Sequence, residues 1–417
     1  MWKVSTTTTL LLWEKKAGSE SMLLKVIKEM LADAMENIGA HQASLPIFAN
    51  KNQILPFKLL EVRTPAANII KQEMLAAGGD AVVPTGCVLN KDKYSDVLLL
   101  GTRKHYNILL KKLELMPYFG MDKVKEELEA VLSESKLQTT LADGRVLNYD
   151  KVLVMGILNI TPDSFYADSR TAIEEVVAKA GQMLADGADI LDIGGESTRP
   201  GSEAVEAEEE QARVVPVIEA LRKAYPNAVI SIDTYRASTA RAAIKAGADI
   251  INDISAMEAD VEMLDVVCET NVPIVLMHMR GTPKNMQTQC EYKNVVEEVA
   301  VYLAERANLL RERGVGADKI ILDPGIGFAK NAEQNLKLMR DLNALTSFGN
   351  PVLLAASRKG TIGKVLGELP AEERLEGTIA TSCQAVYAGA NMVRVHDVKE
   401  NLRAIRMLEA ILCPQHM

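Results

Sequence analysis

The sequence predicts an α/β fold, a (β/α)8 barrel that runs from about Val152 to the end of the chain, preceded by a small α/β or α+β domain. Two observations predict the barrel. Eight short apolar runs of strand length alternate with segments of helical period, and strands that alternate with helices form parallel βαβ units. The eight units occupy about 260 residues, which is the usual size of a closed eight-stranded barrel.

The eight predicted strands are apolar along their whole length, as expected for strands that are covered on both faces. They span about 152–158, 189–193, 229–233, 249–253, 273–277, 319–323, 352–355 and 391–395. Segments with helical periodicity lie between them, for example Thr171–Asp186, Arg236–Ala246 and Tyr292–Arg313. The alternation therefore favours a parallel sheet whose helices cover its outer face.

Four of the strands follow the sequence Gly-Ala-Asp or Gly-Ala-Asn, which begins at Gly187, Gly247, Gly316 and Gly389. We expect each glycine to end the preceding helix in the left-handed conformation, so that a short turn leads into the strand. A doubly wound open sheet is the alternative, and it usually has a glycine-rich phosphate loop after its first strand. Here Asn-Ile-Thr-Pro-Asp (159–163) follows the first strand, which favours the closed TIM barrel.

The length of 417 residues favours two domains, which we place at 1–135 and 136–417. The second begins with a predicted hairpin, Leu137–Lys151, which turns at Asp143-Gly144 and would plug the N-terminal mouth of the barrel. The first domain is expected to hold the helices Met22–Ile38, Ala66–Ala77, Lys104–Leu113 and Asp122–Leu132 and the strands Pro56–Val62 and Val97–Leu100. It has no metal-ligand spacing, phosphate loop or nucleophile elbow, so the sequence predicts no role for it.

The composition excludes several classes of partner. A net charge of −9 disfavours nucleic acid or an anionic membrane. No stretch approaches the ~20 apolar residues of a membrane helix, and the apolar run Leu10–Trp13 is too short for a signal peptide. The five cysteines are scattered without a CxxC pair, and their odd number argues against a disulfide framework. We therefore expect a cytoplasmic protein that binds neither nucleic acid nor membrane.

Polar residues follow all eight predicted strands, at the barrel end where active sites form. Those with the clearest chemistry are Asn159, Asp192, Asp233, Asn252, His278, Asp323, Ser357, Lys359, Arg394 and His396. One such residue would usually be a helix cap or a satisfied polar group. Several, however, interrupt apolar runs, and burial of an unpaired carboxylate costs several kcal/mol. A ligand in the barrel mouth would supply the missing partners.

The residue types suggest what that ligand contains. Asp233, Asn252 and Asp323 offer acceptors and an amide to a flat, donor-rich heterocycle, and Lys359 can bind a ring carbonyl or nitrogen. Arg394 can hold an anion such as a phosphate, together with Asn159 and His396. The sequence therefore predicts a heterocycle deep in the barrel and an anionic group near its mouth.

The barrel segment contains eight motifs: VMGILNITPDSF (154–165), GADILDIGGESTRPGS (187–202), SIDTYR (231–236), INDIS (251–255), MHMRGTPKNMQ (277–287), LDPGIGFAK (322–330), ASRKG (356–360) and RVHDV (394–398). In their order and spacing, these motifs resemble the dihydropteroate synthase family. Any one alone would be weak, but together they are specific. The resemblance covers the chain from about Val152 to its end.

The resemblance implies a transferase of folate biosynthesis, which condenses 6-hydroxymethyl-7,8-dihydropterin pyrophosphate with p-aminobenzoate and releases pyrophosphate. By motif, the pterin ligands would be Asp233, Asn252, Asp323 and Lys359. The pyrophosphate ligands would be Asn159, Arg394 and His396, with Mg2+ at Asn159. The p-aminobenzoate site would contain Thr198, Arg199, Pro200, Phe328 and Ser357. Asp233, Lys359 and Arg394 would carry the catalysis, and no side chain would act as a nucleophile.

The chain departs from the family in the first loop, where Tyr-Ala-Asp-Ser-Arg (166–170) replaces the usual Ser-Asp-Gly-Gly and Asp168 is displaced by one position.

Two alternative functions are a pterin-dependent corrinoid methyltransferase and a non-catalytic pterin-binding protein. The Thr-Arg-Pro, Ser-Arg-Lys and Arg-Val-His motifs disfavour the first, and the pyrophosphate ligands disfavour the second. The resemblance also implies a homodimer, formed by apolar late helices such as Glu376–Ala388 and Asn401–Leu412; these helices could equally pack on the barrel's own strands.

Overall fold

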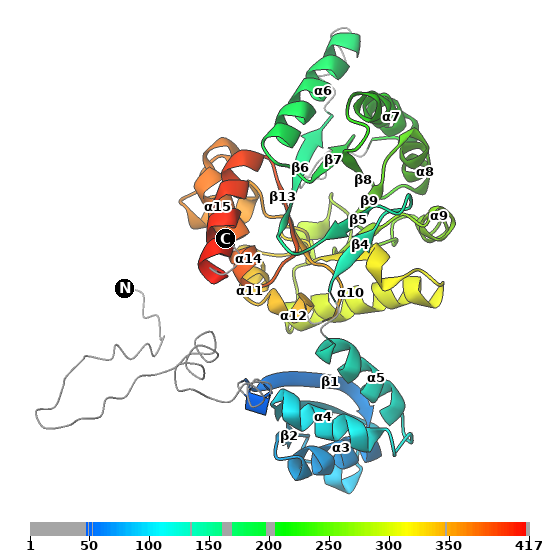
Figure 1. The fold of residues 1–417 in the computed structure, drawn as a ribbon, viewed down its shortest axis with the longest axis vertical. Helices are drawn as coiled ribbons and strands as arrows, with labels where there is room; N and C mark the ends of the chain where they lie inside the picture. Colours follow the sequence, from blue (N-terminus) through cyan, green and yellow to red (C-terminus); the bar gives the residue numbers. More distant parts are fainter. Residues whose placement is uncertain are drawn as a thin grey trace, which may run out of the picture. The chain divides into compact units, whose positions relative to one another are not determined.

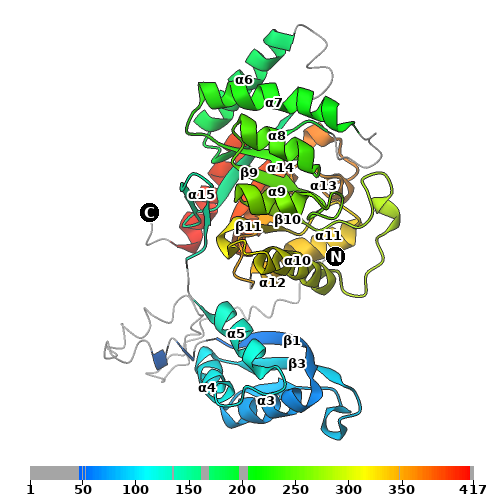
Figure 2. The same ribbon diagram turned by 90° about the vertical axis from the view of Figure 1, so that its right-hand side faces the viewer.

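The computed structural model describes residues 47–48, 50–51, 53–133, 136–160, 169–196, 205–346 and 348–413. The chain divides into two compact units, Met1–Ser133 and Glu134–Met417 (Figures 1 and 2). The predicted helix Met22–Ile38 lies outside the described residues. Over the described ranges, no helix has the length and apolar character needed to cross a membrane.

The second unit is a parallel barrel with its helices on the outside (Figure 1). Its strands are β6 (Leu153–Asn159), β7 (Ile190–Gly194), β8 (Val229–Asp233), β9 (Ile250–Asp253), β10 (Ile274–Met277), β11 (Ile320–Asp323), β12 (Leu353–Leu354) and β13 (Met392–Val395). They lie in the order β11-β10-β9-β8-β7-β6-β13-β12, and a parallel bridge between Leu322 and Val352 joins the two ends. The predicted (β/α)8 barrel is confirmed.

The helices of this unit follow the strands as the sequence predicts. They are α6 (Ser169–Ala185), α7 (Ala207–Ala224), α8 (Ala237–Ala246), α9 (Met263–Thr270), α10 (Val295–Glu312), α11 (Ala332–Arg340), α12 (Asn343–Thr346), α13 (Gly360–Val365), α14 (Leu375–Tyr387) and α15 (Val398–Leu412). One expectation about their ends is wrong. Gly187, Gly247 and Gly389 have positive φ angles, whereas Gly316 has a φ of −63° and the left-handed glycine after α10 is Gly314. The connection from α10 to β11 (313–319) is three or four residues longer than the connections that precede β7, β9 and β13, so the chain reverses earlier.

The barrel interior is built in layers, because alternate residues of each strand point to the axis. The lowest layer is apolar and consists of Leu153, Met155, Ile190, Val229, Ile250, Val275, Ile321, Leu353 and Met392. Two residues further along their strands come the five polar members of the next layer, Asp192, Ser231, Asn252, Asp323 and Arg394. We call these five residues the polar layer. The C-terminal ends of the strands therefore point polar side chains into the barrel, next to an apolar layer that fills the N-terminal side.

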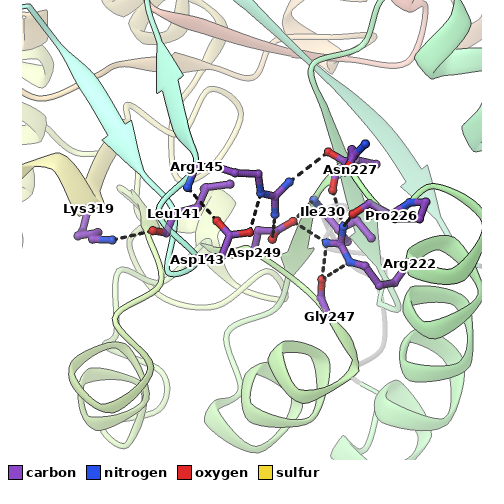
Figure 3. Close-up of polar contacts among 11 residues, drawn as sticks. Leu141, Asp143, Arg145, Arg222, Pro226, Asn227, Ile230, Gly247, Asp249 and Lys319 are labelled. Carbon is purple, nitrogen blue, oxygen red and sulfur yellow. Dashed lines mark hydrogen bonds and ion pairs between the residues drawn. The ribbon is translucent and has the colours of Figure 1, made fainter.

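A hairpin closes the N-terminal mouth of the barrel, as the sequence predicts. Its strands are β4 (Gln138–Thr140) and β5 (Val146–Asn148), and Leu141 between them packs into the apolar lowest layer. Figure 3 shows the polar contacts that hold it. Arg145 binds Asp249 at 2.5 Å, and Lys319 donates to the carbonyl of Thr140 at 2.5 Å. The hairpin is therefore fixed to the barrel by both apolar and charged contacts.

The first unit is a small α+β domain with its own core. Its antiparallel sheet has the order β1-β3-β2, with β1 (Leu55–Arg63), β3 (Tyr94–Gly101) and β2 (Asp80–Val82). Its helices are α3 (Thr64–Ala76), α4 (Arg103–Leu113) and α5 (Met121–Leu132). The core includes Met74, Leu99 and Tyr106, all fully buried. The sequence predicts these elements except β2, whose three residues are too few to show a period.

Candidate active site

A cavity of about 1160 Å³ opens at the carboxyl ends of the barrel strands. Nine predicted site residues line it: Asn159, Asp233, Asn252, Asp323, Phe328, Ser357, Lys359, Arg394 and His396. The remaining three, Thr198, Arg199 and Pro200, lie in segment 197–204, outside the described residues. Asp168 of the altered first loop also lies outside the described residues. The strand ends thus bring together side chains that are up to 237 residues apart in the chain, from Asn159 to His396.

Arg394 is bound by two carboxylates. Its Nε donates to Oδ2 of Asp192 at 2.5 Å, and its Nη2 donates to Oδ2 of Asp233 at 2.6 Å. Burial opposes the charge of Arg394, but Asp192 and Asp233 outweigh burial and raise the pKa of the guanidinium. The arginine that was predicted to hold an anionic group is therefore already part of an ion-pair network across β7, β8 and β13.

Asp233 is a buried acid with a strongly altered proton affinity. Burial raises the pKa of its carboxyl to about 7; Arg394 and Lys359 oppose this, while Asp192 and Glu210 add to it. Burial removes water from the carboxylate, and the ionised form loses more than the neutral one. Asp233 can therefore change its charge near neutral pH, when a ligand or a cation approaches.

Lys359 lies opposite, at the start of α13. Its Nζ donates to the carbonyl of Ile326 and lies 4.7 Å from the centre of the Phe328 ring. Burial lowers the pKa of its amine to about 8, although Asp323 and Asp233 favour the charged form. A partly desolvated ammonium of this kind can donate strongly to a ring carbonyl or nitrogen.

Asn252 and Asp323 are almost completely buried in the polar layer. The Asn252 Nδ2 donates to Asp192 at 3.2 Å. The Asp323 carboxylate accepts from the backbone N–H of Gly325 at 2.7 Å, and burial raises its pKa. Both side chains keep further hydrogen-bonding capacity that faces the cavity.

His396 contributes hydrogen bonds rather than charge. Its Nδ1 lies 2.9 Å from the Ser357 hydroxyl, which also accepts from the His396 backbone N–H at 3.2 Å. Burial, together with the cations Arg394 and Arg358, lowers the pKa of the ring to about 4. The imidazole is therefore neutral at pH 7, so the positive charge at this side of the cavity comes from Arg394.

Sequence reasoning missed a buried lysine that shapes the wall of the cavity. Lys330 is 2% exposed, and its Nζ contacts Nδ1 of His278 at 2.9 Å and the carbonyls of Gly325 and Phe328 at 3.1 and 2.9 Å. These bonds fix the loop after β11, which presents Phe328. The signal that could have found it is the charged residue at the end of the apolar run GIGFA.

The site offers one metal ligand from the predicted set. Asn159 is exposed at the cavity rim, at the end of β6, and supplies a single amide oxygen. Across the described ranges, no three His, Cys, Asp or Glu side chains are grouped so that they could hold a metal. Mg2+ is commonly bound by one or two protein oxygens together with water and substrate phosphates, so Asn159 fits an ion that a phosphorylated ligand completes.

Known proteins resemble this chain in sequence and in fold. The family described as pterin binding enzyme matches residues 155–396. Dihydropteroate synthase of Bacillus subtilis is 48% identical over 264 residues, which are 63% of this chain and 90% of that protein. The bifunctional dihydropteroate synthase/dihydropteroate reductase of Helicobacter pylori is 34% identical over 392 residues, which are 93% of this chain and 99% of that protein.

Among solved structures, Xanthomonas albilineans dihydropteroate synthase with 4-aminobenzoic acid is 40% identical. It superposes with a TM-score of 0.62, over 67% of this chain and 99% of that structure. The family match covers more than half of the chain and spans every cavity residue described above. The chain therefore belongs to the pterin-binding enzyme family and is a dihydropteroate synthase, a transferase of folate biosynthesis.

Proposed function

We propose that the cavity divides the reaction between two sets of side chains. Asp233, Asn252, Asp323 and Lys359 would bind the dihydropterin ring, and Asn159, Arg394 and His396 would bind its pyrophosphate. The observation that carries this proposal is that all seven side chains line one cavity, with the carboxylates and the amide deep in the barrel. Asn159 lies at the rim, where a charged leaving group remains close to water.

The chemistry needs charge stabilisation more than proton transfer. The bond between the pterin methylene carbon and the pyrophosphate oxygen breaks, and its electron pair leaves with pyrophosphate. The remaining carbocation is conjugated with the dihydropterin, so ionised Asp233 would stabilise it. The neutral aryl amine of p-aminobenzoate then attacks the carbon and loses one proton. We therefore assign catalytic roles to Asp233, Lys359 and Arg394 and no role of nucleophile.

Mg2+ is the cofactor we propose, bound by Asn159 and by oxygens of the pyrophosphate. When bound, it would neutralise charge on the leaving group. Arg394 would supply the protein's own positive charge there, and His396 a hydrogen bond from a neutral ring. The lone amide oxygen of Asn159 supports an ion that arrives with the substrate rather than one that is permanently held.

The p-aminobenzoate site is proposed beside the Phe328 ring and the Ser357 hydroxyl, which line the same cavity as the pterin ligands. Thr198, Arg199 and Pro200 would complete it. Lys359 supports this assignment, because its Nζ lies over the Phe328 ring. A proposed pterin ligand and a proposed neighbour of p-aminobenzoate are therefore in contact, as expected if the two substrates bind side by side.

Pyrophosphate release tests the function. The purified protein should release pyrophosphate with Mg2+ only when dihydropterin pyrophosphate and p-aminobenzoate are both present. Omission of either substrate is the control. No release over a range of Mg2+ concentrations would contradict the proposal, and methyl transfer from methyltetrahydrofolate to a corrinoid would favour the methyltransferase alternative.

A second candidate activity is the reduction of dihydropteroate. The observation that favours it is the Helicobacter pylori relative, which is called bifunctional and aligns with 93% of this chain, including most of the first unit. The step would add a hydride and a proton across a C=N bond of the pterin and would need a nicotinamide or flavin reductant. We expect the full chain, incubated with dihydropteroate and each reductant, to oxidise the reductant; unchanged absorbance with both classes would rule the activity out.

A homodimer and a cytoplasmic location are further proposals. Helices α14 and α15 each bury one face against the barrel, but large apolar side chains remain exposed on them, with Tyr387 at 71% and Met407 at 63%. We propose that these side chains belong to the surface through which two copies associate. Light scattering should give twice the chain mass, and the Met407→Glu substitution should halve the measured mass.

The cytoplasmic location is proposed because all five cysteines are free, which suits a reducing compartment.

A further inference from the structure

Asp192 has no role in the division proposed above, although it lies at the centre of the polar layer. It is fully buried on β7, and its Oδ2 accepts from Arg394 at 2.5 Å and from Asn252 at 3.2 Å. One carboxylate oxygen thus holds a proposed ligand of the pyrophosphate and a proposed ligand of the pterin. Burial of a carboxylate without hydrogen-bond partners costs several kcal/mol of folding free energy, so these two bonds also offset the cost of burying Asp192.

One terminal nitrogen of Arg394 already has a carboxylate partner. Its Nη2 is bound to Asp233 at 2.6 Å, and Asp233 is the carboxylate that the pterin ring is expected to use. When the heterocycle binds Asp233, it competes with that nitrogen for the carboxylate, which frees Nη2 for another partner. The pyrophosphate of the same substrate is the anion expected beside it. Asp192, which binds the guanidinium through Nε, can stay in place throughout.

We propose that Asp192 is a positioning residue, which anchors Arg394 through Nε and orients Asn252, so that Nη2 of Arg394 can pass from Asp233 to the substrate's pyrophosphate. This inference rests on the proposed division of the cavity. It explains why two carboxylates share one guanidinium: one is the permanent partner, and the other is released to the heterocycle. A bidentate cation held at one end keeps its geometry while the other end changes partner.

The unused oxygen of Asp192 supports an anchoring role. In the described part of the barrel, Oδ1 of Asp192 and Oγ of Ser231 are the buried side-chain polar atoms that lack a hydrogen-bond partner. The two residues are register partners on β7 and β8. Buried polar atoms are nearly always satisfied, so this pair indicates spare acceptor capacity beside the guanidinium. A carboxylate with such capacity can hold Arg394 in more than one orientation.

The test compares Asp192→Asn with the wild-type enzyme in steady-state kinetics. The substitution keeps the size of the side chain but removes its charge, so Arg394 should pair more exclusively with Asp233 and compete with the pterin. The loss of a charged hydrogen bond predicts a KM for dihydropterin pyrophosphate about tenfold higher or more. The KM for p-aminobenzoate should stay within about twofold of wild type, since Phe328 and Ser357, the proposed p-aminobenzoate ligands that the structure describes, make no hydrogen bond to Asp192. Calorimetry with inorganic pyrophosphate should show the same weakening.

Asp189→Asn is the matched control, because it removes a carboxylate three residues earlier, at the other end of the barrel, where Asp189 accepts from the Val154 N–H. It should lower the melting temperature without separating the two KM values. A double-mutant cycle with Arg394→Met should show that Asp192→Asn costs much less when Arg394 is absent. Equal effects on both KM values, fully multiplicative effects in the cycle, or unchanged pyrophosphate binding would each overturn the inference.

Failure of the proposed function would look different. In that case the wild-type enzyme itself would make no dihydropteroate. Binding of inorganic pyrophosphate would still be measurable by calorimetry in the wild type and in Asp192→Asn. A wild-type enzyme that turns over normally beside an unaffected Asp192→Asn variant would leave the function standing and remove the role of Asp192.

Discussion

The two ends of the barrel use the same residue types in opposite ways. At the N-terminal end, Asp249 accepts from Arg145 at 2.5 Å, from Arg222 at 2.7 Å and from the Ile230 N–H at 2.8 Å, so both of its oxygens are used (Figure 3). At the C-terminal end, Asp233 shares Arg394 with a second carboxylate and faces a cavity of about 1160 Å³.

The two networks differ in how completely their hydrogen-bonding groups are paired. The Arg222 guanidinium also donates to the carbonyls of Pro226, Ala228 and Gly247, so the network at the plugged end is closed by the backbone. In the polar layer, Asp192 and Ser231 instead keep unpaired atoms. Saturated charges hold a fold together, whereas charges that share too few partners remain available to a ligand. The predictions below test this contrast.

The largest effect is expected for Asp233→Asn. The substitution removes the charge that would stabilise the developing carbocation, and loss of one such group lowers kcat roughly 10²–10³-fold. The melting temperature should change little or rise, because burial opposes ionisation of Asp233. Initial rates of pyrophosphate release and a thermal melt measure the two quantities. A variant with wild-type kcat would contradict the catalytic role.

Asp249→Ala should have the reverse effect. It leaves two guanidinium groups and the Ile230 N–H without their shared acceptor. Because Arg145 is about one-third exposed, water offsets part of the loss, and we expect about 2 kcal/mol of destabilisation. The kcat of the folded fraction should stay near that of wild type. Chemical denaturation combined with active-site titration would check this; a large loss of kcat with unchanged stability would erase the contrast between the two ends.

The pH dependence sharpens the contrast further. Asp233 has a pKa of about 7 and an ordinary value of 3.8, whereas Lys359 has a pKa of about 8 and an ordinary value of 10.5. Asp233 must be ionised and Lys359 protonated to act as proposed, so kcat/KM should be bell-shaped, with limbs near 7 and 8. Lys359→Arg stays charged and should lose the basic limb. A flat profile between pH 5.5 and 9 would argue against both assignments.

The same carboxyl group makes a stability prediction with a definite sign. Its raised pKa means that the folded state keeps the proton between about pH 4 and 7 while the unfolded state loses it. The stabilisation is therefore complete below about pH 4 and is lost as the pH rises through 7. The unfolding free energy of wild type minus that of Asp233→Asn should fall over this range. Denaturant titrations at several pH values measure it, and a difference that grows with pH would contradict the assignment.

Much of the barrel could be predicted because its strands are buried on both faces. Seven of the eight start one residue after the predicted position, and β8 coincides with it (229–233). The cavity residues followed from reading the strand ends. The ion pairs of Arg394 could not be predicted in the same way. Its partners Asp192 and Asp233 are 202 and 161 residues away in the chain, and the sequence does not show which carboxylates a long side chain reaches in the folded barrel. The alternation of β7 and β8, in contrast, already places Asp192 and Ser231 in one layer.

The smallest effect on synthase activity is expected when the first unit is removed. The barrel unit begins at Glu134 and has its own core, so a chain that starts at Lys136 keeps the hairpin and the Arg145–Asp249 contact. Its kcat should stay within about twofold of the full chain, since no described cavity residue precedes Ile157. A chain that starts at Val152 is the sharper comparison, because it also loses Leu141 and Arg145 and exposes the apolar lowest layer. It should melt at a lower temperature than the Lys136 chain. If both truncations lost activity equally while remaining folded, the first unit would have to act on the cavity, and the N-terminal end would not be the purely structural half of the barrel.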